Sequence, residues 1–213
     1  MATPQPPTRG ALIVIEGLDR AGKSTQCSRL QQRIPNSRII KFPDRSTPIG
    51  QLINNYLTSA SSPPLTDQAI HLLFSANRWE LLPSLLAALS AGETLILDRY
   101  IYSGISFSVA KGALSYEYCR SPDVGLPLPD GIIFLDLPPD VAAERAGFGG
   151  ERYEKREMQE KVREVFKTVR EREQGEWTVV DASASVEEVT ERVWAATEKA
   201  LRWARENELR EIE

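Results

Sequence analysis

A phosphate-binding loop lies near the start of the chain. Residues 17 to 25 read Gly-Leu-Asp-Arg-Ala-Gly-Lys-Ser-Thr, the G-x-x-x-x-G-K-[ST] spacing whose backbone N–H groups surround the phosphates of a nucleoside triphosphate. An apolar, β-branched segment at 11–15 precedes it and a helical pattern follows, so a chance glycine turn is disfavoured. The predicted ATP-binding residues of the loop are Asp19, Arg20, Ala21, Gly22, Lys23, Ser24 and Thr25.

Charge at the loop defines its chemistry. Lys23 would neutralise the β- and γ-phosphates, and the Ser24 hydroxyl would bind Mg²⁺. Asp98 ends a second apolar run at 94–98, and Arg99 follows it. At the carboxyl edge of a sheet, where ligands of open α/β sheets bind, Asp98 could hold Mg²⁺ and Arg99 could bridge two phosphates. Alternatively, Asp98 caps the next turn beside a solvated arginine.

Three further segments carry ligand chemistry. Arg45 follows a third apolar run and could hold a second phosphate or be a solvated loop residue. Phe74 and Arg78 share a helix face, where they could stack and hydrogen-bond a base, although spacing alone favours a core phenylalanine with a snorkelling arginine. The glycine-rich stretch at 145–156 is predicted to be a lid, with a plain flexible connection as the alternative. His71, the one histidine, is assigned no role.

Elements that position these residues alternate along the chain. Apolar strand-like runs at 11–16, 38–42, 94–98, 131–137 and 177–180 are separated by helical patterns, chiefly 25–33, 67–90, 154–173 and 185–205. Ser185 opens the last helix with the form of a capping box. The alternation predicts an α/β protein with a P-loop fold: a five-stranded parallel sheet flanked by helices on both faces, with a lid.

Composition and length limit the remaining possibilities. The chain has 213 residues, which suits one domain, predicted at 10–205 between a disordered tail at 1–9 and a frayed, charged end at 206–213. A net charge of −4 argues against nucleic acid as a partner, and no apolar run suits a membrane span. Cys27 and Cys119 fit no metal spacing, so free thiols and a cytoplasmic or nuclear enzyme are expected.

Taken together, the segments resemble thymidylate kinase, in particular the eukaryotic kind. Five of them match in order: Glu16-Gly-Leu-Asp-Arg-Ala-Gly-Lys-Ser-Thr25, Phe42-Pro-Asp-Arg-Ser46, His71-Leu-Leu-Phe-Ser-Ala-Asn-Arg-Trp79, Asp98-Arg-Tyr100 with Ser103-Gly104, and Gly149-Gly-Glu-Arg-Tyr-Glu154. The resemblance covers residues 9 to about 205. It implies transfer of the γ-phosphoryl group of ATP to dTMP with Mg²⁺ as cofactor, giving dTDP for DNA synthesis, and a homodimer.

The resemblance also implies where the substrates bind. Phe74 would stack the thymine and Arg78 would bond its edge, with Ser108 as a weaker candidate, while Arg45 and Arg99 would hold the acceptor phosphate. The sugar is expected to contact Tyr100, Asp19 and Tyr153. The pocket is expected to be lined by Phe42, Leu57, Gly104 and Phe107. The adenine is expected to lie against Arg145, Asp181, Ala182 and Ser183.

Catalysis by such an enzyme depends more on positive charge that offsets the phosphate charges than on proton transfer. A nucleoside monophosphate is largely ionised at neutral pH, so no strong base is needed, and Lys23, Arg99, Arg20 and Mg²⁺ would offset the charge. An arginine inside the loop suggests that Arg20 is a built-in arginine finger, although Arg152 and Arg156 of the lid leave that division open.

Three other functions remain as rivals. A deoxynucleoside kinase would need a base and no acceptor-phosphate arginine, so Arg45 argues against it. A GTPase switch would carry an Asn-Lys-x-Asp motif, which is not found in the sequence. A catalytically dead relative would have lost some of Lys23, Ser24, Asp98 and Arg99, all of which are retained.

Overall fold

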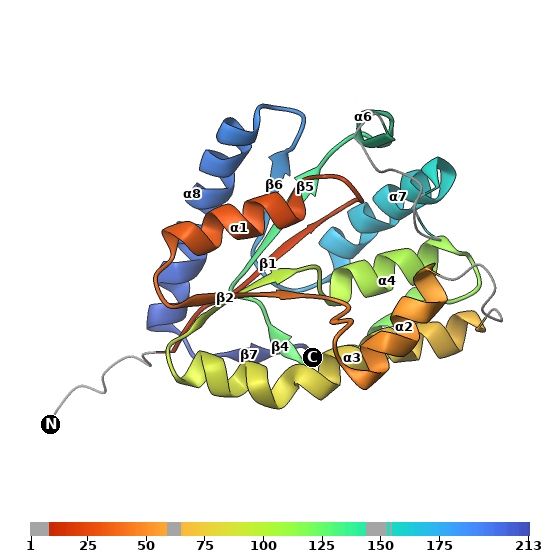
Figure 1. The fold of residues 1–213 in the computed structure, drawn as a ribbon, viewed down its shortest axis with the longest axis horizontal. Helices are drawn as coiled ribbons and strands as arrows, with labels where there is room; N and C mark the ends of the chain where they lie inside the picture. Colours follow the sequence, from red (N-terminus) through yellow and green to blue (C-terminus); the bar gives the residue numbers. More distant parts are fainter. Residues whose placement is uncertain (1–8, 59–64, 144–152, 154) are drawn as a thin grey trace, which may run out of the picture.

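Five parallel strands form the central sheet (Figure 1). The computed structural model describes residues 9–58, 65–143, 153 and 155–213. The strands are β1 (Leu12–Gly17), β2 (Ser37–Lys41), β3 (Thr94–Asp98), β5 (Gly131–Asp136) and β6 (Trp177–Asp181), in the order β2-β3-β1-β5-β6. Pairing of Ile15 with Asp98 brings the carboxyl ends of β1 and β3 to the same edge.

Helices cover both faces of the sheet. On one face lie α1 (Lys23–Arg33) and α8 (Val186–Glu206), and on the other α3 (Asp67–Ser90), α4 (Ile101–Ala110) and α7 (Arg156–Arg172) (Figure 1). Helix α2 (Pro48–Thr58) packs on α3. Short helices occur at α5 (Tyr116–Arg120), η1 (Ser121–Asp123) and α6 (Pro139–Ala143). The predicted fold class, a P-loop sheet flanked on both faces, is confirmed.

Alternating side chains of the strands divide the core in two. In β1, Leu12 and Val14 pack with α3, α4 and α7, whereas Ile13 and Ile15 pack with α1 and α8. Every residue of β1 is buried. Since both faces of a parallel sheet are covered, its strands read as continuous apolar runs, which is why the sequence located them.

Local signals set the helix boundaries. Gly22 has a φ of 97°, a left-handed conformation that glycine adopts without strain, and α1 begins at the next residue. The Thr66 hydroxyl accepts a hydrogen bond from Ala69 N and begins α3. The predicted capping box is present at the start of α8, where Ser185 and Glu188 bond reciprocally. Helix α7 starts at Arg156, two residues later than the start predicted at residue 154.

The C-terminal end differs from its prediction. Residues 206–213 were expected to fray, but β7 (Arg210–Glu211) pairs antiparallel with β4 (Pro127–Leu128), and Ile212 is 2% exposed. The expectation was wrong because the segment holds two apolar residues among its charged ones, and both Leu209 and Ile212 pack against the core. Arg9 was assigned to the disordered tail, yet its guanidinium pairs with Asp130 at 2.7 Å. Residues 1–8 and most of the predicted lid, 144–152 and 154, lie outside the described residues.

Candidate active site

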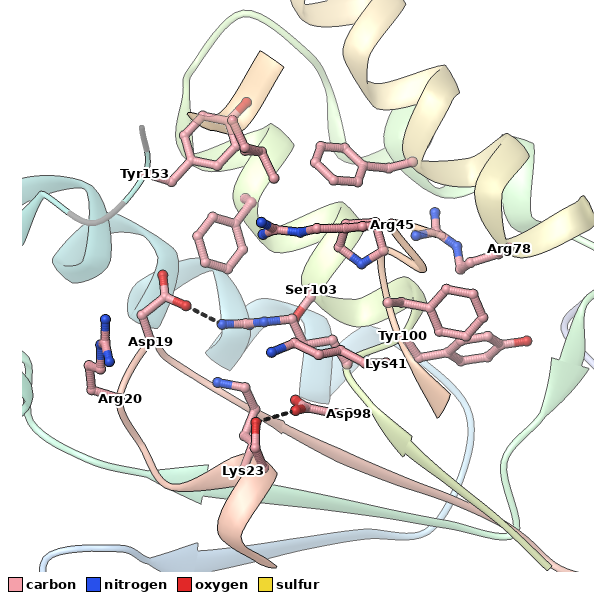
Figure 2. Close-up of a pocket in the computed structure, with 18 of the residues that line it drawn as sticks. Asp19, Arg20, Lys23, Lys41, Arg45, Arg78, Asp98, Tyr100, Ser103 and Tyr153 are labelled. Carbon is pink, nitrogen blue, oxygen red and sulfur yellow. Dashed lines mark hydrogen bonds and ion pairs between the residues drawn. The ribbon is translucent and has the colours of Figure 1, made fainter. Parts of the chain in front are cut away.

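A cavity of about 560 Å³ opens at the carboxyl ends of β1, β2 and β3. Figure 2 shows Lys23 and Arg20 at one end of it and Arg78 at the other, with Arg45 and Lys41 between them. All of the residues predicted to contact dTMP line this cavity, although they come from distant parts of the chain: Asp19, Phe42, Arg45, Leu57, Phe74, Arg78, Arg99, Tyr100, Gly104, Phe107, Ser108 and Tyr153.

Lys23 lies almost completely buried at the phosphate end. Only 6% of the residue is exposed, and its Nζ donates to the carbonyl oxygen of Leu18 at 2.6 Å. Burial, with nearby Arg99, lowers the pKa of Lys23 to about 8, although Asp19, Asp98 and Glu16 act in the opposite direction. A bound polyphosphate would supply the negative charge that the ammonium form needs.

Ser24 and Asp98 form a pair of oxygen ligands beside the loop. The Ser24 hydroxyl donates to Asp98 Oδ2 at 2.6 Å. The other carboxylate oxygen, Oδ1, is buried and has no hydrogen-bond partner among the described residues. A hydroxyl and a carboxylate oxygen without a partner suit a hard cation such as Mg²⁺. The residues at this position therefore fit the expected metal.

Arg99 lies at the centre of the cavity. Its φ of 73° is unusual for a residue with a side chain, and such strain is characteristic of functional sites. The guanidinium donates to Gly17 O and Ser103 Oγ, both at 3.0 Å, and pairs with Asp19. Burial works to raise the pKa of Asp19, but Arg99 and Lys23 hold that pKa below its ordinary value.

Glu16 holds the backbone on the C-terminal side of Arg99. No role in the site was predicted for Glu16 from the sequence. Its buried carboxylate accepts hydrogen bonds from the backbone N–H groups of Tyr100 and Ser103, at 2.9 and 3.0 Å, and from the Ser103 hydroxyl at 2.5 Å. Burial raises the pKa of Glu16, and nearby Arg99 counters that effect. Glu16 thereby connects β1 to the first turn of α4 and orients the Arg99 segment.

An aromatic and an arginine define the other end of the cavity. Phe74 and Arg78 of α3 both line it, and Figure 2 shows Tyr100 beside Arg78. Arg78 is 2% exposed and makes a bidentate ion pair with Asp123, at 3.0 and 2.6 Å. The predicted proximity of Phe74 and Arg78 is therefore present, and Arg78 is held by a partner that the sequence did not indicate.

His71 and Ser108 lie beside this end. The His71 ring is fully buried, with Nδ1 2.8 Å from Ser108 Oγ and Nε2 2.9 Å from Cys119 O. Burial lowers the pKa of His71. These bonds agree with the expectation that His71 packs and hydrogen-bonds.

Arg45 and Arg20 approach the cavity from different loops. Arg45 follows β2, and its Nη1 donates to Asn54 Oδ1 at 3.1 Å. Arg20 lies next to Asp19 in the phosphate loop and has a φ of 64° (Figure 2). The two arginines thus belong to different ends: Arg45 to the middle of the cavity, and Arg20 to the loop that would surround the donor phosphates.

An aromatic cluster forms the side of the cavity to which Tyr153 belongs. The Tyr153 ring lies 6.0 Å from Phe107 and 6.3 Å from Tyr56, and Lys111 Nζ is 4.7 Å from the Tyr153 centroid. Gln159 of α7 joins this side to the phosphate loop, because its Nε2 donates to Asp19 Oδ2 at 2.7 Å and to Tyr153 O at 3.0 Å. Tyr153 is thus the described residue of the predicted lid that reaches the cavity.

Some predicted ATP contacts do not line the cavity. Ala21 is 2% exposed, packs in the core between the sheet and α1, and donates its N–H to Leu18 O. Asp181 is the last residue of β6, and Ala182 and Ser183 follow it; the Asp181 carboxylate accepts hydrogen bonds from the N–H and the hydroxyl of Ser183. Arg145 lies outside the described residues.

Sequence reasoning missed several residues that line or support the cavity. Lys41 and Lys111 line it directly, while Glu16, Gln159 and Asp123 hold its charged residues. Lys41 had a usable signal, since it lies next to the end of the strand predicted at 38–42. The others carry no local pattern, because their partners lie far away in the sequence.

The fold and the loop define a P-loop nucleotide-binding protein with room for a second ligand beside the triphosphate. Comparison with known proteins narrows this class. The thymidylate kinase family profile matches residues 15–193. The thymidylate kinase of Schizosaccharomyces pombe is 52% identical over 192 residues, covering 87% of this chain and 90% of that protein. The human thymidylate kinase is 45% identical over 208 residues, covering 96% and 97%.

A solved structure agrees. Thymidylate kinase from Candida albicans superposes with a TM-score of 0.88 and 42% identity, covering 96% of this chain and 99% of that one. The chain therefore belongs to the thymidylate kinase family, whose kinases phosphorylate dTMP to dTDP with ATP. The resemblance found in the sequence is confirmed.

Proposed function

We propose that this chain carries out the reaction of its family within the cavity of Figure 2, with ATP at the phosphate loop and dTMP between Arg45 and Arg78. The observation that supports this most strongly is the single cavity that joins Lys23 to Phe74 and Arg78. It offers phosphate-binding groups at one end and an aromatic–arginine pair at the other. A nucleoside monophosphate has this arrangement of charge and base.

Phosphoryl transfer in this cavity depends on charge and alignment. The acceptor phosphate is already ionised near neutral pH, so its oxygen can attack without a strong base. Lys23 and Arg99 offset the charge of the two phosphate groups, and Arg45 holds the acceptor. Arg20, located in the donor loop, stabilises the charge that develops on the transferring group. The predicted lid, when closed, excludes water from the site.

Mg²⁺ is the proposed cofactor, and Ser24 and Asp98 are the residues that would hold it. When bound, it neutralises charge on the donor phosphates and orients them. The orphaned Asp98 Oδ1 supports this assignment.

Substrate choice comes from the opposite end of the cavity. Phe74 stacks on the thymine, and Arg78 donates to its carbonyl edge. Tyr100, which is fully buried, stands where a ribonucleotide would carry its 2′-hydroxyl. The adenine of ATP lies outside this cavity, toward Arg145 and the turn formed by Asp181, Ala182 and Ser183.

The experiment that tests the proposal is a coupled ATP assay of the purified chain with dTMP, dUMP, UMP, dCMP and thymidine. We expect dTMP to have the highest kcat/KM and thymidine to give no product, because thymidine lacks the phosphate that Arg45 would hold. The folded Lys23→Ala variant should lose nearly all turnover and serves as the blank. A preference for thymidine would support the rival deoxynucleoside kinase.

Association and location are also proposed. Leu52 of α2 and Leu72 and Leu86 of α3 are 40–55% exposed, on helices that pack side by side. Such apolar exposure supports a homodimer through α2 and α3, which light scattering of the purified chain would test.

No helix in the described ranges has the length and apolar character to cross a membrane. We place the enzyme in the cytoplasm or the nucleus, and imaging of the tagged chain would test this.

A further inference from the structure

Asp123 lies behind the base-binding end of the cavity and is fully buried. It belongs to the short helix η1, far along the chain from α3. Three residues on one face of α3 attach to this segment. The Ser75 hydroxyl donates to Asp123 Oδ1 at 2.7 Å, Arg78 makes the bidentate pair, and Trp79 Nε1 donates to Pro122 O at 2.7 Å. The carboxylate is therefore fixed before any ligand binds.

The Arg78 guanidinium is constrained on two of its edges. Asp123 takes the N–H groups of Nε and Nη2, so the remaining nitrogen, Nη1, has no partner among the described residues. Gly104 faces the guanidinium on the other side, where a Cβ would lie 3.1 Å from both Nη1 and Nη2. Glycine at this position leaves room for the guanidinium, and Asp123 prevents it from turning.

A fixed guanidinium discriminates between bases more sharply than a mobile one. Arginine is always charged and donates only, so it suits a carbonyl oxygen and opposes an amino group. Thymine and uracil carry a carbonyl at position 4, and cytosine carries an amino group there. A mobile arginine could shift to the neighbouring ring nitrogen of cytosine, which accepts a hydrogen bond. An arginine that is held in one position cannot make that shift, so it binds cytosine poorly.

We infer that Asp123 is a positioning residue that locks Arg78 in the register that reads a carbonyl at position 4 of the pyrimidine, and thereby sets the preference for dTMP over dCMP. The inference rests on the proposed function, since it requires the base to lie against Arg78.

The test replaces Asp123 with asparagine and measures kcat/KM and calorimetric binding of dTMP, dUMP and dCMP. The amide of Asp123→Asn turns a donor toward the guanidinium, so one of the two bonds is lost and Arg78 becomes mobile. The dissociation constant for dTMP should rise roughly tenfold to a hundredfold, and the preference for dTMP over dCMP should fall at least about tenfold. The dTMP-to-dUMP ratio and the KM for ATP should not change.

Two further variants separate an effect on the position of Arg78 from an effect on the stability of the fold. Asp130→Asn breaks the bidentate pair with Arg9, at 2.8 and 2.7 Å, at the amino ends of β1 and β5 and outside the lining of the cavity. It should lower the melting temperature without changing the dTMP-to-dCMP ratio. Ser75→Ala removes one hydrogen bond from Asp123 and keeps the ion pair. It should shift the ratio in the same direction by a smaller factor, and it replaces Asp123→Asn if that protein does not fold.

Variants of Arg78 distinguish a failure of the inference about Asp123 from a failure of the proposed function. In an Arg78→Met background, adding Asp123→Asn should change the ratio by less than about twofold, because Asp123 acts through Arg78. If Arg78→Met alone leaves dTMP binding intact, the proposed position of the base is wrong. If Arg78→Met weakens dTMP binding while folded Asp123→Asn or Ser75→Ala keeps the dTMP-to-dCMP ratio of the unmodified protein, only the role of Asp123 is overturned.

Discussion

Single residues of this site carry charges that are almost fully removed from water. Lys23, Asp98 and Arg78 are each 2–6% exposed, and Glu16 is completely buried. Buried charges are tolerated where they are paired or await a charged ligand. Arg78 and Glu16 have partners within the protein. Lys23 donates to an uncharged carbonyl, and Asp98 keeps one oxygen without a partner among the described residues. Both lie beside the loop that would surround phosphates and Mg²⁺, so their burial indicates a ligand.

Replacement of Arg45 tests the acceptor site. Arg45→Ala should raise the dissociation constant for dTMP about tenfold to a hundredfold, since a lost charged hydrogen bond costs roughly 1.5–3 kcal/mol, and should leave ATP binding nearly unchanged. Calorimetric titration with each nucleotide measures both. Arg38→Ala is the control, because Arg38 pairs with Glu93 and does not line the cavity. Unchanged dTMP affinity in folded Arg45→Ala would place the acceptor phosphate elsewhere.

Replacement of Arg20 tests the source of catalytic charge. If Arg20 stabilises charge that appears during transfer, Arg20→Ala should lower kcat on the order of 10³-fold with little effect on dTMP binding. The comparison is Arg152→Ala of the predicted lid, with both variants assayed at saturating substrates. A large loss of kcat confined to the Arg152 variant would assign the catalytic charge to the lid.

The lowered pKa of Lys23 predicts a pH dependence for ATP binding. In the free protein Lys23 loses its proton near pH 8 because burial disfavours the charged form, with Arg99 adding to the effect. Bound phosphates favour the charged form, so they raise that pKa and binding takes up a proton. ATP affinity should therefore fall as the pH rises above about 8. Calorimetry at pH 8.5 in two buffers of different ionisation enthalpy should detect the uptake, and Lys23→Ala should abolish it.

At the scale of elements, strand ends and helix starts place the charged groups. The loop joins β1 to α1, whose first residue is Lys23, so the helix directs its N-terminal N–H groups toward the phosphate position. Asp98 ends β3 beside this loop, and Arg45 follows β2 one strand further out. The active site is thus a consequence of three adjacent parallel strands that end at one edge.

Helix α8 supports the far side of the sheet, and its cap can be tested alone. Ser185→Ala removes the hydroxyl that accepts from Glu188 N at 3.3 Å and should cost about 0.5–2 kcal/mol. The melting temperature should drop by about a few degrees, and kcat/KM for dTMP should not change. Ser84→Ala makes the same chemical change at an exposed position inside α3 and should have little effect. Equal melting temperatures for the two variants would contradict the cap.

At the scale of the whole molecule, Arg9, the first residue that the structure describes, and the C-terminal segment are both held against the core. Arg9 donates to Asn207 O at 3.0 Å, and the C-terminal strand β7 pairs with β4. The N–H of Ile212 donates to Leu126 O, and Gly125 N donates to Ile212 O, both at 2.8 Å. This pairing braces the segment that follows Asp123, so the end of the chain helps to hold the base-binding side of the site.

Ile212 provides the test of this bracing. Ile212→Ala should lower the free energy of unfolding by about 2–5 kcal/mol, because it leaves a cavity at a residue that is 2% exposed. Urea denaturation measures the change. Glu211→Ala, at the exposed last residue of β7 directly before Ile212, should be nearly neutral. An unaltered free energy of unfolding for Ile212→Ala would mean that the segment frays.

Much of this protein was determined by local sequence alone. The phosphate loop, the five parallel strands and the capped α8 follow from spacing, apolar runs and cap residues, which act over a few positions. Phe74 with Arg78, and Asp98 with Arg99, were identified as candidates for the same reason. Short-range geometry requires no knowledge of the rest of the chain.

Only the tertiary structure decided which distant residues became partners. Asp123 lies 45 positions from Arg78, Gln159 lies 140 positions from Asp19, and Ile212 fills a core formed by much earlier segments. A buried carboxylate, amide or isoleucine has no periodic or spacing signal of its own, because its role is set by what packs against it. The sequence therefore determined the chemistry available at the sheet edge, whereas the packing of α3 on η1 and of α7 on the phosphate loop decided how that chemistry is oriented.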